Sequence, residues 1–129
     1  MCLNAKGNYK IAKEDIVCYK ILSENYYGEL YSPFTLFKIK TDVVMTAEGK
    51  TEIEKFRDVK RISRGYFHTF KVRKTAVEHS CGPRPVYECV IPKGTKYWEG
   101  KFGTALGYAS KKLIVKSREP EKKIPMIDL

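Results

Sequence analysis

One segment of the sequence, from Lys55 to Lys74, combines the two residue types that bind nucleic acid. Basic side chains recur through it, Asp58 is its only acid, and Tyr66, Phe67 and Phe70 lie among them. Lysine and arginine neutralise phosphates, and an exposed aromatic ring stacks on an unpaired base. The pattern predicts a surface that binds nucleic acid or another polyanion. The residues expected to make the contacts are Lys60, Arg61, Arg64, Lys71, Arg73 and Lys74.

A second interpretation of this segment stays open. In a strand, Tyr66, His68 and Phe70 face one way, while Phe67 and Thr69 face the other. One aromatic set then belongs to the core, where aromatic residues are usually found. The segment would be an ordinary buried strand beside a solvated, charged connection.

The histidines and cysteines form no recognisable catalytic or metal-binding pattern. His68 and His79 are the only histidines, and the spacing of the four cysteines matches neither Cys-X-X-Cys nor a zinc-binding His pair. His68 could act as a base only with an orienting carboxylate, which the sequence does not identify. The sequence therefore predicts no metal, no cofactor and no catalytic residue, and favours a non-enzymatic protein over an enzyme.

Four short segments carry a resemblance to known proteins. They are Glu14–Lys20, Gly65–Phe70, Ile91–Tyr97 and Tyr108–Ser110, together with the opening Met-Cys-Leu. In combination they resemble a group of uncharacterised small proteins of gut bacteria and their phages. This resemblance implies an accessory protein of phage or mobile-element type, and it carries no activity with it.

The order of these motifs also resembles the ADP-ribosyltransferase fold. Tyr19-Lys20 stands where that family has a Tyr-Arg or His pair, and Gly65–Thr69 where it has a Gly-Phe-X-Ser-Thr-Ser motif. The catalytic glutamate of the family would fall near Tyr108–Lys112, which contains no carboxylate. The resemblance therefore implies an inactive domain that binds a nicotinamide dinucleotide. Its ligand cleft would be formed by Tyr19, Lys20, His68 and Thr69.

The composition favours one globular domain with a polyanionic partner. The chain has 129 residues, of which 43% are hydrophobic, and a net charge of +10. That length and apolar content support a core, and the charge favours nucleic acid or an acidic protein as partner, although it could also serve solubility alone. No apolar run reaches membrane-spanning length or resembles a signal peptide, so we expect a cytoplasmic protein without membrane contact. The oligomeric state is left open.

Strand signals dominate the elements that must position these residues. The expected strands, rich in β-branched and aromatic residues, include Asp15–Leu22, Tyr66–Phe70, Val86–Ile91 and Leu113–Val115. Lys71–His79 lacks Gly and Pro and repeats Val72, Ala76 and His79 at helical spacing, which predicts a two-turn helix.

A weaker helical pattern occurs in residues 47–64, where Ile53, Phe56 and Val59 could share one face, but the polar residues of this segment fit a solvated connection equally well. We therefore predict an α+β domain with a bent antiparallel or mixed sheet and one or two short helices. It would occupy residues 1–129, with a loose leader at 1–13 and an extended tail at 117–129.

Overall fold

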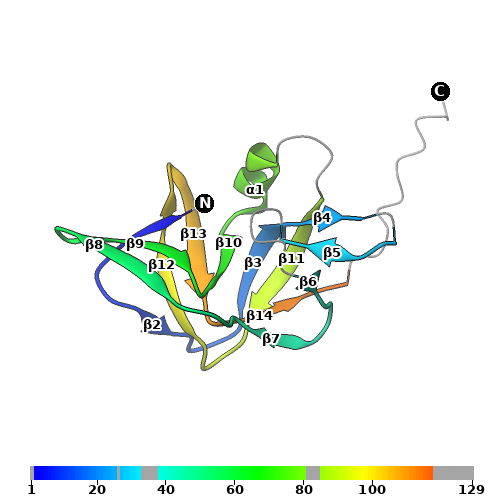
Figure 1. Cartoon of the computed structure of the whole chain (residues 1–129), viewed down its shortest axis with the longest axis horizontal. Coiled ribbons are helices and arrows are strands. Elements are labelled where there is room, and N and C mark those ends of the chain that lie inside the picture. Colours follow the sequence, from blue (N-terminus) through cyan, green and yellow to red (C-terminus); the bar gives the residue numbers. More distant parts are fainter. Residues whose placement is uncertain (1, 26, 33–37, 81–84, 118–129) are drawn as a thin grey trace.

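The fold is built almost entirely from strands, with a single helix in the described residues (Figure 1). The structure is a computed structural model that describes residues 2–25, 27–32, 38–80 and 85–117. The strands are β1 (Leu3–Lys6), β2 (Lys10–Ile11), β3 (Ile16–Ile21), β4 (Ser23–Glu24), β5 (Leu30–Tyr31), β6 (Lys38–Ile39), β7 (Val44–Thr46), β8 (Glu52–Phe56), β9 (Val59–Arg64), β10 (Phe67–Phe70), β11 (Val86–Ile91), β12 (Lys96–Phe102), β13 (Ala105–Ser110) and β14 (Lys112–Val115). The helix is α1 (Arg73–His79).

One antiparallel sheet contains 11 of these strands. Its order is β7-β14-β11-β3-β10-β13-β12-β1-β9-β8, and β2 pairs with β12. Strands β4, β5 and β6 form a separate small sheet. Figure 1 shows the large sheet in two halves, with β8, β9, β12 and β13 on the left, β11, β14 and β7 on the right, and α1 above the region between them.

The predicted α+β class is wrong, because most of the described chain is strand and the helix is one short element. The main error lies in residues 47–64, where β8 and β9 form a hairpin in place of a helix. Its turn contains Arg57, which has a φ of 57° that a helix does not allow. In the hairpin register, Ile53 is opposite Ile62, and Phe56 is opposite Val59.

The helix expected over 71–79 is α1, and its stability comes from packing. It has seven residues and no side-chain cap, and a helix this short is unstable alone. Ala76 is fully buried in a cluster with Phe70 and Val86, so the helix covers the sheet around β3, β10 and β11.

The N-terminal residues are not a loose leader. Strand β1 lies between β9 and β12, with Leu3 and Ala5 buried and Asn4 and Lys6 exposed. This strand was not predicted because only two residues, Leu3 and Ala5, alternate with polar ones, which is too short a pattern. The predicted C-terminal tail lies, from residue 118 onward, outside the described residues.

The half of the sheet that runs β10-β13-β12-β1-β9 curls into an open barrel. Its inner face carries one hydrophobic cluster, which joins Ile62 of β9 to Phe70 of β10 through Leu3, Trp98 and Ala109. Strands β9 and β10, at the two ends of this path, approach each other across the interior. There, His68 Nε2 lies 3.2 Å from the Ile62 carbonyl oxygen.

A second hydrophobic cluster lies on the opposite face of the sheet, in the other half. It contains Cys18 of β3, Leu22 directly after β3, Cys89 of β11 and Leu113 of β14, all fully buried. The two clusters on opposite faces explain why β3 and β10, which run between the halves, have buried residues on both sides. Within the described ranges, no helical segment has the length and apolarity needed to span a bilayer.

Candidate nucleic-acid interface

A row of exposed basic residues crosses the outer face of the barrel half. Strand alternation turns Leu3 and Ile62 inward, so their neighbours Asn4 and Arg61 face outward. The register places Asn4 opposite Arg61 on one side and Lys101 on the other. Two cations from strands far apart in the sequence therefore flank one polar residue on this face.

Glu99 extends this row by holding two further lysines. Lys10 Nζ lies 2.9 Å from Glu99 Oε2, and Lys71 Nζ lies 3.3 Å from Glu99 Oε1. The hydrogen bond from Lys10 lowers the pKa of Glu99, and partial burial raises it by a smaller amount. The net result is a pKa below the ordinary value. One carboxylate shared by two lysines leaves an excess of positive charge, and such exposed pairs are weak enough for a phosphate to compete with them.

We call this surface the basic barrel face. It consists of the cations Lys6, Lys10, Arg61, Lys71 and Lys101 and the carboxylates Glu54 and Glu99. Lys6, Lys10 and Lys101 were not among the residues predicted from the sequence, because they lie outside the Lys55–Lys74 segment. Only the sheet register brings them beside Arg61, and their sole sequence signal is the high net charge.

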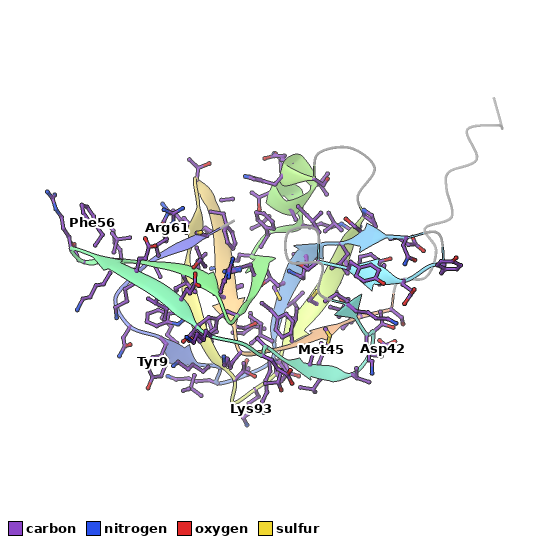
Figure 2. The ribbon with its side chains drawn as sticks, viewed as in Figure 1. Tyr9, Asp42, Met45, Phe56, Arg61 and Lys93 are labelled. Carbon is purple, nitrogen blue, oxygen red and sulfur yellow. The ribbon has the colours of Figure 1, made fainter. Side chains whose placement is uncertain are left out.

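The β8–β9 hairpin adds an exposed aromatic ring next to this face. Every residue of β8 is exposed, because only β9 pairs with it. Phe56, at the end of β8, is 73% exposed, and the Arg57 guanidinium carbon lies 5.7 Å from the centre of its ring. Figure 2 shows Phe56 at the far end of the hairpin, with Arg61 further along on the upper side. A ring in this position has no core to pack against and is available for stacking.

The six basic residues predicted from the sequence do not form one surface. Arg61 and Lys71 belong to the basic barrel face. Lys60 points to the other side of β9, with its ammonium 4.9 Å from the Trp98 ring centre. The remaining three are elsewhere: Arg64 lies 3.8 Å from Glu52 beside a cavity, and Arg73 and Lys74 are exposed on α1.

The cavity beside Arg64 lies where the barrel half remains open between β9 and β10. Its volume is about 760 Å³. The residues around it come from β3, from the β7–β8 connection, and from the chain between β9 and β10. They include Lys20, Ile21, Ala47, Glu48, Gly49, Lys50, Glu52, Arg64, Gly65, Tyr66, Phe67, His68 and Phe70, with Cys2, Ser32 and Ser63.

The four residues of the predicted dinucleotide cleft are divided between two faces of the sheet. Lys20 and Thr69 lie on the side of the cluster that contains Cys18, whereas Tyr19 and His68 lie on the side of the barrel interior. Lys20 and His68 line the cavity, and Tyr19 and Thr69 are not part of its lining. Strand alternation separates Tyr19 from Lys20 and His68 from Thr69, so neighbours in the sequence contribute to different sites.

His68 is a half-buried, neutral side chain. Burial lowers the pKa of His68 to about 3. Its Nε2 atom must donate to the Ile62 carbonyl, since that oxygen can only accept. Its ring also contacts Phe102 edge to face, with ring centres 5.7 Å apart. The side chain therefore helps to fill and close the barrel interior.

Comparison with protein-family models, curated proteins and solved structures finds no match to this chain. The candidate sites are therefore interpreted from their own geometry and electrostatics.

Proposed function

We propose that this protein is a non-enzymatic accessory protein that binds nucleic acid through the basic barrel face. The observation that supports this proposal is the convergence of cations from β1, β2, β9, β12 and the segment after β10 on one exposed surface, in excess of its carboxylates. Such a surface attracts the phosphate backbone without regard to base sequence.

Single-stranded nucleic acid fits this surface better than a duplex. Phe56 is exposed at the end of the same hairpin that carries Arg61, and an exposed ring gains energy by stacking only on a base that is not already stacked in a helix. A strand whose phosphates follow the basic barrel face could place a base on Phe56.

A reducing compartment is part of the proposal. Cys2, Cys18 and Cys89 are free thiols, and free thiols persist where glutathione keeps cysteine reduced. We place the protein in the cytoplasm, where it would meet nucleic acid.

The proposal is tested with two double variants that each remove two positive charges, one from the basic barrel face and one, as a control, from elsewhere on the surface. The test variant is Arg61→Ala with Lys101→Ala. The control is Lys93→Ala with Lys112→Ala, which removes two charges from exposed positions outside the basic barrel face, in the turn between β11 and β12 and on β14. Figure 2 shows Lys93 at the lower edge of the molecule, away from Arg61.

We expect the test variant to bind a labelled single strand more weakly than the control, with a shallower dependence on salt. Each phosphate contact to a single strand contributes about 0.7 to the slope of log K against log salt concentration, so losing two should lower the slope by about 1.4. Fluorescence anisotropy measures both quantities. Equal affinities and slopes for the two folded variants would refute the assignment of this face.

A further inference from the structure

Lys20 is a buried amine with no counter-ion in the part of the chain that the structure describes. Its side chain lies on β3 and is 7% exposed. Nζ donates one hydrogen bond, to the His68 carbonyl oxygen at 3.0 Å. Among the described residues, no carboxylate forms an ion pair with it. A protonated amine has three N–H groups to satisfy, so this environment supports the ammonium ion poorly.

The uncharged amine is the form that this environment favours. A buried ammonium ion loses its hydration, and this loss is costly unless a charged or hydrogen-bonding partner compensates for it. Burial accordingly lowers the pKa of Lys20. An uncharged amine has a free electron pair and is a nucleophile, which an ammonium ion is not.

The amine also has a space into which a reactant can enter. Lys20 lines the cavity of about 760 Å³, a size typical of small-molecule sites. Ile21, Phe67 and Phe70 supply apolar wall, while exposed residues such as Glu48 and Lys50 stand at its border. The cavity therefore has both apolar side chains and solvent-exposed residues in its wall.

The thiols near Lys20 do not compete with it. Cys18 and Cys89 pair across β3 and β11, are fully buried, and do not line the cavity. Burial raises the pKa of Cys18 to about 12 and also raises the pKa of Cys89, so both remain protonated and unreactive. Cys2 does line the cavity, and any test must separate its chemistry from that of Lys20.

We propose that Lys20 captures small apolar aldehydes or ketones in this cavity as a Schiff base. The electron pair of Nζ attacks the carbonyl carbon, a C–N bond forms, and the nitrogen loses one proton while the carbonyl oxygen gains one, which gives a carbinolamine. The hydroxyl group then takes up a second proton and leaves as water, the nitrogen loses its second proton, and a C=N bond remains. No oxidant or reductant is required. The site is separate from the basic barrel face and does not depend on nucleic-acid binding.

The test is reductive trapping of the intact protein with butyraldehyde and sodium cyanoborohydride at pH 7, which transfers hydride to the C=N carbon and leaves a stable secondary amine. Peptide mass spectrometry gives the rate of modification at each lysine in one sample. Lys112, which is exposed on β14, is the internal reference. Because burial lowers the pKa of Lys20 and so raises its uncharged fraction, we expect Lys20 to be modified faster than Lys112.

Two comparisons complete this test without relying on a destabilised variant. The Cys2→Ser variant should keep the fast modification of Lys20, since the amine and not the thiol forms the bond. In urea, where the cavity is lost, Lys20 and Lys112 should react at similar rates. Modification of Lys20 in the folded protein no faster than that of Lys112, or loss of the fast reaction in Cys2→Ser, would overturn the proposal.

Discussion

His68 is a residue whose protonation is coupled to folding. In the folded protein its pKa lies at about 3, chiefly because of burial, whereas an unfolded histidine has a pKa of about 6.5. Between these two values the unfolded chain binds a proton that the folded chain does not. The free energy of unfolding should therefore decrease as the pH falls from about 6.5 toward 3, by up to about 1.4 kcal/mol per pH unit from this residue.

The His68→Gln variant isolates this contribution. Glutamine keeps an N–H donor for the Ile62 carbonyl but does not titrate, so carboxylate effects are common to both proteins. Urea unfolding at pH 7, 6, 5 and 4 should show a smaller loss of stability in the variant than in the wild type. If the two proteins lose stability in parallel across this range, His68 is not a neutral side chain in the folded protein.

Phe56 separates binding from stability at a single residue. Its ring is 73% exposed, so Phe56→Ser should leave the urea midpoint almost unchanged. Stacking of a base on an aromatic ring is worth about 1–3 kcal/mol, and the variant should therefore bind single-stranded DNA at least about fivefold more weakly. Tyr27→Ser, at another ring exposed to 88%, is the matched control and should bind as the wild type does. Equal affinity of the two variants would remove Phe56 from the interface.

At the scale of elements, the contact between β1 and β12 depends on a glycine. A Cβ atom at Gly100 would overlap the backbone carbonyl oxygen of Asn4, whereas a Cβ at Gly103, in the β12–β13 turn, meets nothing within 4 Å. Gly100→Ala must push two paired backbones apart, which we expect to cost about 3 kcal/mol.

Gly103→Ala serves as the control, since only its φ of 63° opposes the substitution, at a cost of about 1 kcal/mol. Urea unfolding gives both values. Because β1 carries Asn4 between Arg61 and Lys101, Gly100→Ala should also weaken nucleic-acid binding. A Gly100→Ala protein as stable as Gly103→Ala would show that β1 does not lie this close to β12.

The elements that the sequence predicted correctly are those with a strong local pattern. The strands around 15–22, 66–70, 86–91 and 113–115 have β-branched and aromatic residues, and each corresponds to a strand in the structure. The β8–β9 hairpin was missed because its residues are polar and exposed, and its apolar positions happen to repeat at helical spacing. Cross-strand pairing, which no local window contains, decided its structure.

At the scale of the whole molecule, the sequence pointed to an exposed basic surface, but of the six cations it named only Arg61 and Lys71 lie on the basic barrel face. Net charge and the Lys55–Lys74 segment pointed to a polyanion partner, yet Lys6, Lys10 and Lys101 join Arg61 only through the sheet register. The same register separated Tyr19 from Lys20 and revealed the cavity around the latter. Long-range pairing determines both sites, and a single sequence does not record it.

The most direct test of the central proposal is the binding of the wild-type protein to a fluorescein-labelled single-stranded oligonucleotide and to the matching duplex, by anisotropy at 50 and 200 mM salt. We predict micromolar binding of the single strand at the lower salt concentration, weaker binding of the duplex, and a loss of affinity of about tenfold to a hundredfold at the higher one. Absence of binding at 50 mM salt, or an affinity that does not change with salt, would contradict a phosphate-binding role for the basic barrel face.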